Sequence, residues 1–294
     1  MRIFTDDYVV MDYETGGLSR ICKRPVETGM LLFKDGEVKL HAHLVNPRLD
    51  GDQEFYIDLG AMNVHGIGDE MIEADGWHPK KCAATMIQNT GDLPLWGHNA
   101  ARFDFPIMSN EARKFGLTPV SQTQWRDSAA FYKGWRLQKY PDQYPDLMTY
   151  MTKVLGIRRK GLLYNLPFLT KTLDLGVRML DENGEKTDIP GEMVVLEVDP
   201  HLGVSDEIIK SIEQLGAHRA AFDCVVTHGL IQWIKRNIGA MIDPDDPNLT
   251  PSEDALDEPL PGDDATVAPK EPSLADLAAE GEPDAIDPED EDAI

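Results

Sequence analysis

The stretch Tyr8-Val-Val-Met-Asp-Tyr-Glu14 begins as an apolar run and ends in two acids. A short run of this kind predicts a buried β-strand. Side chains two residues apart on a strand point the same way, so Asp12 and Glu14 should face one site. The following Thr15-Gly-Gly17 would let a ligand approach the backbone closely. Acids at a strand end are more often simply solvated, and this pair alone leaves both interpretations open.

Further strand-like and helix-like runs follow this stretch along the chain. Runs at 29–34 and 37–45 flank Asp35-Gly36, a dipeptide typical of tight hairpin turns. We predict helices at about 79–89, 102–115, 128–134, 142–155, 166–175 and 217–236, short strands at 93–96 and 124–127, and an inserted hairpin at 177–198. Three strands in a meander, followed by alternating helices and strands, predict an α/β fold with a mixed sheet and helices on both faces.

A second acidic position lies in Gly97-His-Asn-Ala-Ala-Arg-Phe-Asp-Phe105, where a predicted strand runs into a turn and then a helix. Asp104 should lie near the start of that helix, where the helix dipole stabilises a negative charge. Alone, it fits a helix-start acid as well as it fits a metal ligand. Asn99 is expected to form the turn, and Phe103 is either a core residue or a surface on which a base could stack.

The third acidic position is in Ala217-His-Arg-Ala-Ala-Phe-Asp223, at the start of the last predicted helix. Residues five apart on an α-helix differ by about 140° in direction. His218 and Asp223 can therefore share a site only if His218 lies on the turn before the helix. Because a single His or a helical Asp is usually structural or solvated, the argument depends on all three acidic sets occurring in this order.

The ordered set D-x-E, G-H-N-x-x-x-F-D and H-x-x-x-x-D resembles the three motifs of the DEDDh (DnaQ-like) 3′–5′ exonucleases, a branch of the ribonuclease H-like fold. Val64-His-Gly-Ile67, Trp125-Arg-Asp127 and the Leu-rich stretch 162–176 extend the resemblance over roughly residues 8–236. Gly16 stands where many family members have a second Thr. The resemblance implies a ribonuclease H-like mixed sheet with helices on both faces.

The candidate site residues suit metal-dependent phosphodiester hydrolysis. The four carboxylates of Asp12, Glu14, Asp104 and Asp223 fit hard, oxygen-preferring cations, so we expect Mg²⁺ or Mn²⁺. Two such ions can stabilise both the attacking and the leaving oxygen. His218 can take the proton of the attacking water near neutral pH.

The resemblance implies an enzyme that removes nucleoside 5′-monophosphates from a DNA 3′ end, in proofreading, repair or nucleotide recycling. Its substrate contacts are expected at Thr15, Gly17, Leu18, His65, Asn99 and Phe103. His65 fits a loop hydrogen-bonding role equally well. Arg158-Arg-Lys160 either contacts the phosphates of a single strand or is an ordinary solvated surface. An RNA-directed exonuclease of the same family is the alternative, since the motifs do not reveal contacts to a 2′-hydroxyl.

The charge of the chain is concentrated at its C-terminal end. Of 52 acids and 28 bases, 19 acids and one base lie in 241–294, so residues 1–240 carry only −6 of the net charge of −24. The segment 241–294 has nine prolines and no aromatic residue, which predicts a disordered acidic tail. We therefore expect an exonuclease domain over 1–240. The tail could carry a motif for a polymerase or sliding clamp, in which case the protein would act mainly as an interaction subunit.

The cellular setting follows from three further features of the sequence. Cys22, Cys82 and Cys224 are far apart and form no C-x-x-C pair, which favours a reducing compartment over a disulfide framework. The first residues lack the long apolar core of a signal peptide. No apolar run approaches the roughly 20 residues of a membrane span. We expect a cytoplasmic protein with no membrane partner.

Overall fold

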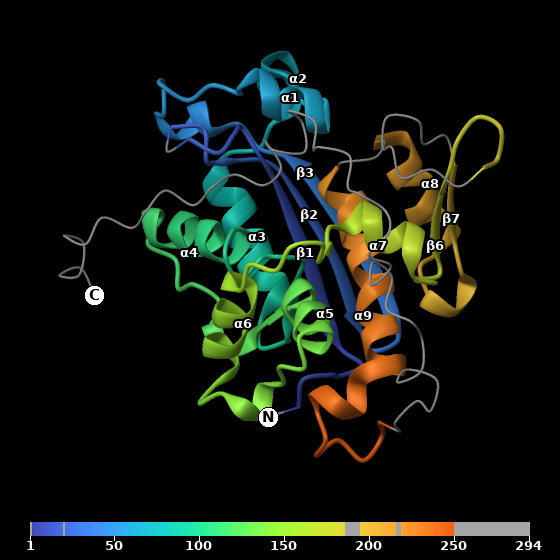
Figure 1. Ribbon diagram of the computed structural model, residues 1–294. Helices are drawn as coiled ribbons and strands as arrows, with labels where there is room; N and C mark the ends of the chain where they lie inside the picture. Colours follow the sequence, from blue (N-terminus) through green and yellow to red (C-terminus); the bar gives the residue numbers. More distant parts are fainter. Residues whose placement is uncertain (1, 20, 186–194, 216–218, 250–294) are drawn as a thin grey trace.

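The computed structural model describes residues 2–19, 21–185, 195–215 and 219–249, and its centre is a five-stranded sheet (Figure 1). The strand order is β3-β2-β1-β4-β5, with β1 antiparallel to β2 and parallel to β4. The strands are β1 (Tyr8–Thr15), β2 (Pro25–Lys34), β3 (Glu37–Leu44), β4 (Leu95–Gly97) and β5 (Trp125–Asp127). The meander, the hairpin at Asp35-Gly36 and the mixed sheet are all confirmed.

Helices cover both faces of the sheet. They are α1 (Leu59–His65), α2 (Asp69–Asp75), α3 (Pro79–Thr90), α4 (Asp104–Lys114), α5 (Ser128–Arg136), α6 (Leu147–Gly156), α7 (Leu166–Thr172), α8 (Asp206–Leu215) and α9 (Ala220–Ile242). Helix α9 lies along one face, against β1 and β2, and α3 and α4 lie on the other side (Figure 1). Most of the 23 residues of α9 are buried, as expected of a helix that is apolar on nearly all sides.

Alternation along β1 divides its side chains between the two faces. Val9, Val10 and Met11 are buried, so the strand runs through the centre of the core. Asp12 and Glu14 point toward α9, whereas Tyr13 points to the opposite face, where burial and then the charge of Glu111 on α4 raise the pKa of its hydroxyl. An irregularity between Glu14 and Thr15 then interrupts the pairing with β2. The strand therefore delivers two acids to the α9 face and ends there.

Several predicted boundaries were wrong. The helix expected from 142 begins at Leu147, because Asp146 caps it by accepting a hydrogen bond from Thr149 N–H. The helix expected from 102 begins at Asp104. The sequence reading missed α1, α2 and α8, which are only seven to ten residues long. The inserted hairpin is confirmed as β6 (Val177–Leu180) and β7 (Val195–Val198), which form a separate two-stranded sheet.

The first residues of the predicted tail, from 241, are not disordered: α9 runs to Ile242, and the chain just beyond it stays in contact with the body. Asp243 accepts a hydrogen bond from Ile3 N–H at 2.7 Å, and Asp246 is buried. Most of the predicted acidic tail, residues 250–294, lies outside the described residues. Among the helices that are described, none has both the length and the apolar character of a membrane span.

Candidate functional site

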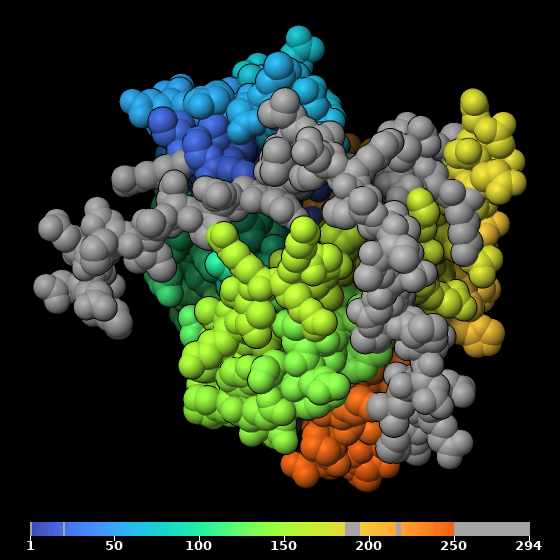
Figure 2. Space-filling model, viewed as in Figure 1, coloured from blue at the N-terminus to red at the C-terminus, as the bar shows by residue number. Residues whose placement is uncertain are grey.

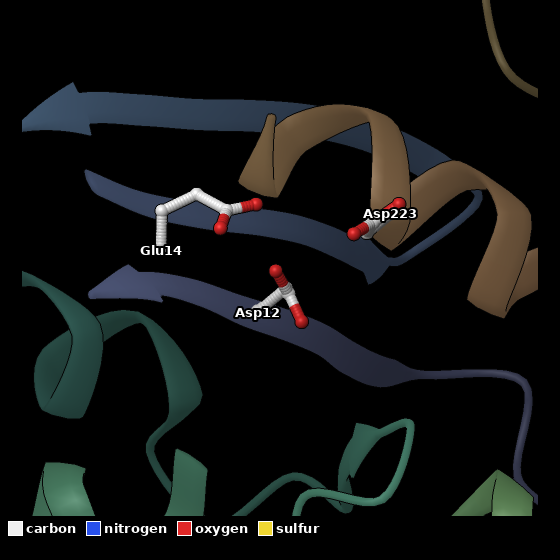
Figure 3. A group of neighbouring side chains, drawn as sticks. All are labelled: Asp12, Glu14 and Asp223. Carbon is white, nitrogen blue, oxygen red and sulfur yellow. The ribbon is translucent and has the colours of Figure 1, made fainter. Parts of the chain in front are cut away.

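Three of the predicted metal ligands meet between β1 and α9. Asp12 and Glu14 project from β1, and Asp223 projects toward them from the first turns of α9 (Figure 3). One carboxylate oxygen of each residue lies within 4.8 Å of one from each of the others. The three side chains are half-buried, so they are shielded by the fold yet accessible to a small ion.

Close packing between β2 and α9 brings Asp223 to the sheet. Gly29 on β2 is the register partner of Asp12. A Cβ atom at Gly29 would lie 2.3 Å from the carbonyl carbon of Ala220, the first residue of α9. Only glycine allows the helix backbone to approach the sheet this closely. This approach brings Asp223, which follows Ala220 on the first turns of α9, toward Asp12.

The carboxylates of the cluster disfavour one another's ionised forms. Burial, followed by the charges of Asp104 and Asp223, raises the pKa of Asp12 well above its usual range. Burial and the charge of Asp223 do the same for Glu14. Burial, with Glu27 adding to it, raises the pKa of Asp223 to about 7. Carboxylates held this close at neutral pH fit a divalent cation, which would neutralise them.

Asp104 adjoins this cluster without joining it in the described geometry. It is buried at the first position of α4, and its Oδ1 accepts a hydrogen bond from Tyr13 N–H at 3.2 Å. Burial, together with the charges of Asp127 and Asp223, raises its pKa to about 8. Asp104 therefore reaches β1 between the two strand acids, close enough to interact electrostatically with the site.

Asp127 fixes the turn that carries the second motif. Its Oδ1 accepts from Asn99 N–H and Ala130 N–H at 3.1 and 3.0 Å, and its Oδ2 accepts from Ala101 N–H at 2.8 Å. Asn99 is exposed and has a left-handed backbone with φ of 57°, as a turn former would. Asp127 thus caps α5 and also holds the β4–α4 connection, which places Asp104.

The sequence reading missed a fifth acid beside the cluster. Glu27 on β2 is the register partner of Glu14 and is only 1% exposed. It forms an ion pair with Arg219, whose Nε donates to both carboxylate oxygens at 3.0 Å. Ala220 N–H donates to Glu27 Oε2 at 2.9 Å. The signal in the sequence was an acid two residues before the strand predicted at 29–34.

Three of the remaining predicted residues around β1 are buried. Thr15 and Gly17 are buried, and a Cβ at Gly17 would lie 1.8 Å from Asp58 Oδ2. His65 is also buried: Ile67 N–H donates to its Nδ1 at 3.0 Å, and its Nε2 donates to the Thr15 carbonyl at 3.1 Å. Burial lowers the pKa of His65. Both ring nitrogens thus hold backbone in place, which is the arrangement expected of a loop hydrogen-bonder.

Two other predicted substrate contacts lie where a ligand could reach them. Leu18 is 54% exposed. Phe103 is half-buried, and Lys23 Nζ lies 4.8 Å from the centre of its ring. His218 lies outside the described residues; its neighbour Arg219 immediately precedes α9.

Comparisons with known proteins found matches among solved structures alone. No protein-family model matches the chain, and no curated protein matches it. Among solved structures, the zinc-bound complex of E. coli exonuclease I with single-stranded DNA matches with a TM-score of 0.50 and 16% identity over 79% of this chain. A complex of E. coli exonuclease I with a dA13 oligonucleotide gives 0.46 and 15% over 82%, and an apo exonuclease I gives 0.47 and 15% over 82%.

These matches concern only part of the larger proteins. The chain spans 41%, 42% and 44% of their lengths, respectively. At 16% identity, the match with a TM-score of 0.50 shows the fold alone, and that fold is the ribonuclease H-like mixed sheet expected from the sequence. Its central strand carries the first two acids of the candidate site.

Proposed function

We propose that this chain is a metal-dependent 3′–5′ exonuclease of the DEDDh kind, which hydrolyses phosphodiester bonds at single-stranded DNA 3′ ends. Its products would be nucleoside 5′-monophosphates, and its role would be in proofreading, repair or nucleotide recycling. The observation that carries the proposal is the meeting of Asp12, Glu14 and Asp223 on one face of a ribonuclease H-like sheet. The first and third motifs, which lie about 200 positions apart in the sequence, supply these carboxylates.

The donor set suits hard divalent cations, and we propose that it holds two Mg²⁺ or Mn²⁺ ions. All the candidate ligands are carboxylates, the oxygen donors that these hard cations prefer. Asp12, Glu14 and Asp223 would hold the ions, and Asp104 would contribute from α4. When bound, the ions would supply electrostatic stabilisation of the charge that develops on the attacked phosphate.

The protein's own residues would supply the proton transfer and the positioning. His218 would accept the proton of the attacking water, as an imidazole can near neutral pH. His218 immediately precedes Arg219 in the sequence, and Arg219 in turn precedes α9. The Arg219 side chain is hydrogen-bonded to Glu27 on β2. Asp127 and Tyr13 would keep Asp104 aligned through the hydrogen bonds described above.

The nucleic acid strand would lie across the accessible residues beside the cluster. Leu18, Asn99 and Phe103 would contact the terminal nucleotides, with Thr15, Gly17 and His65 shaping the backbone beneath them. The segment between α6 and α7, which carries Arg158-Arg-Lys160, crosses in front of the sheet and lies at the surface (Figures 1 and 2). These exposed cations, with the exposed Arg102, would contact phosphates.

The test is to incubate the full chain and Mg²⁺ with 3′-labelled single-stranded DNA, 3′-recessed DNA and single-stranded RNA of one sequence. We expect stepwise loss from the 3′ end, fastest on single-stranded DNA, and no loss with EDTA or with Asp223→Asn. Faster loss of RNA would favour the RNA-directed alternative. Absence of degradation of all three substrates would contradict the proposal.

A matched chain ending at Leu249 tests the tail. Our alternative proposal is that residues 250–294 bind a polymerase or clamp. That role predicts equal nuclease rates with and without the tail, and binding to such a partner only with it.

The three cysteines are free and buried, and we propose a cytoplasmic setting on that basis.

A further inference from the structure

We propose that Glu27 and Arg219 are positioning residues for the metal site, acting as a brace that sets α9 against the sheet. The proposal rests on the metal site of the proposed function but does not depend on the substrate. Glu27 lies outside the three motifs, Arg219 occupies an unspecified position within the third, and neither is one of the clustered carboxylates.

The brace joins three pieces of chain at one point. Arg219 Nε donates to both oxygens of Glu27 at 3.0 Å, and its Nη1 donates to the carbonyl of Leu215 at 3.5 Å. Glu27 also accepts from Ala220 N–H at 2.9 Å. One buried ion pair therefore connects β2, the last residue of α8 and the first residue of α9.

Arg219 and its partner Leu215 lie on either side, in the sequence, of the segment that carries His218. Leu215 precedes this segment and Arg219 follows it. Asp223 lies one turn further along α9, and its backbone N–H donates to the Arg219 carbonyl at 3.1 Å. Holding Arg219 therefore fixes where the first turn of α9 begins, and with it the direction of Asp223.

Burial makes this pair sensitive to loss of either partner. Glu27 is 1% exposed and Arg219 is 7% exposed. Removing one partner would leave the other charge uncompensated in the interior, so the first turn of α9 would move to hydrate it. Partners that orient the ligands of a metal typically change metal affinity by about 10–100-fold when they are mutated.

The structural role can be separated from simple electrostatics by two substitutions of opposite charge effect. Glu27→Gln removes a negative charge near the site, so electrostatics alone predicts weaker cation binding. Arg219→Gln removes a positive charge, so electrostatics alone predicts tighter binding. A positioning role predicts weaker binding in both. Arg219→Lys, which keeps the charge but loses the two-pronged geometry, should fall between Arg219→Gln and the unmodified protein.

Asp243→Asn is the matched control, because it makes the same change of carboxylate to amide at the other end of α9. Asp243 is buried and hydrogen-bonded to Ile3 N–H. The ends of this 23-residue helix lie about 35 Å apart at 1.5 Å per residue. The control should therefore lower the melting temperature while leaving cation affinity unchanged.

The experiment measures Mn²⁺ affinity of the full chain by electron paramagnetic resonance, with no substrate, beside a thermal melt. We expect Glu27→Gln and Arg219→Gln each to weaken affinity about 10–100-fold. Tighter Mn²⁺ binding by Arg219→Gln, equal binding by both variants and the unmodified protein, or an equal loss in Asp243→Asn would each overturn the inference. If Arg219→Gln does not fold, Arg219→Lys replaces it, and unchanged affinity in that variant and Glu27→Gln overturns the brace.

Failure of the inference and failure of the proposed function give different results. If the unmodified chain binds no Mn²⁺, both the metal-dependent function and the brace are wrong. If it binds Mn²⁺ and degrades DNA, but the brace variants bind it equally well, only the brace is wrong.

Discussion

Asp12 on β1 pairs in register with Gly29 on β2, and the missing side chain of Gly29 is the space that the backbone of α9 occupies. The carbonyl carbon and oxygen of Ala220 would lie 2.3 and 2.4 Å from a Cβ at that position. These are backbone atoms, so a rotamer change cannot relieve the contact. The close approach between the acids of β1 and Asp223 therefore requires glycine at position 29.

Gly29→Ala should push the start of α9 away from the sheet. Overpacking of this kind costs about 1–3 kcal/mol in the free energy of unfolding. We expect nuclease activity to fall by at least about tenfold, because misplacement by about 1 Å can cost 100-fold. Gly156→Ala is the control, since a Cβ there has no atom within 4 Å. Thermal melts and Mg²⁺ titrations of activity check this; equal activity of the two variants would contradict it.

Asp12→Asn should have opposite effects on the stability of the metal-free protein and on its activity. Burial and repulsion from Asp104 and Asp223 raise the pKa of Asp12, so its charge destabilises the metal-free fold at pH 8. The variant should melt higher than the unmodified protein in EDTA, with about 2–4 °C gained per kcal/mol for a chain of this size. It should also lose Mg²⁺-dependent activity. A lower melting temperature in EDTA would argue against charge crowding at the site.

The parts of the fold that could be predicted are those that local pattern encodes. The apolar run before Asp12 and the Asp35-Gly36 turn identified β1 and the hairpin, because strand burial and turn geometry depend on neighbouring residues. Short helices such as α1 carry little pattern, since seven residues give less than two turns of periodicity. Asp58 caps α1 through Ala61 N–H, a signal that many loop acids share.

The same division applies to the candidate site. Asp12, Glu14 and Asp223 could be identified because their spacing within each motif is local and the motifs keep a fixed order. Glu27 could not, because its importance depends on a partner 192 positions away. Asp104 is not one of the three clustered carboxylates, and its position also depends on a hydrogen bond to Tyr13 across the fold. Contacts between distant segments depend on how the chain packs, and the spacing of residues within a motif does not specify that packing.

Stability of the metal-free protein should fall as pH rises from 6.5 to 8. The pKa values of Asp223 and Asp104 are raised to about 7 and about 8, so the folded state binds more protons than the unfolded state over this interval. Stability therefore decreases with pH. His98 and His228, with pKa values lowered to about 4 by burial, act in the opposite sense, and their effect fades as pH rises above the ordinary histidine pKa of about 6.5.

Mg²⁺ should reverse this decline, because it binds the deprotonated carboxylates. The rise in melting temperature caused by Mg²⁺ should be larger at pH 8 than at pH 6.5. Differential scanning fluorimetry at both pH values, with and without EDTA, measures it. Asp223→Asn should reduce both the pH dependence and the Mg²⁺ effect. A Mg²⁺ effect that shrinks as pH rises would be incompatible with binding at these acids.

Asp127→Asn should loosen the turn that carries the second motif. An amide has one acceptor oxygen, so the bonds from Asn99 N–H and Ala101 N–H cannot both be kept in their present form. We expect a loss of about 1–3 kcal/mol in stability and a fall in activity, because Asp104 follows this turn. Asp146→Asn changes an exposed helix cap in the same way and should leave activity unaltered. Denaturant unfolding and initial rates of DNA degradation test the pair.

His218→Ala should lower turnover without removing the metal site. Loss of a general base typically costs 10²–10⁴-fold in rate. Mn²⁺ affinity should persist, because the carboxylates of Asp12, Glu14 and Asp223 would still be present. His201→Ala is the control, since His201 is exposed and pairs only with Asp199 among the described residues.

Single-turnover rates from pH 6 to 9 distinguish a base from a structural residue at position 218. If His218 accepts the proton, the rate of the unmodified protein should fall toward pH 6 as the imidazole becomes protonated, and the variant should lack that limb. A variant that retains both the rate and its pH dependence would rule out His218 as the base. A variant that loses Mn²⁺ affinity as well as rate would instead assign it to holding α9, the role proposed for its neighbour Arg219.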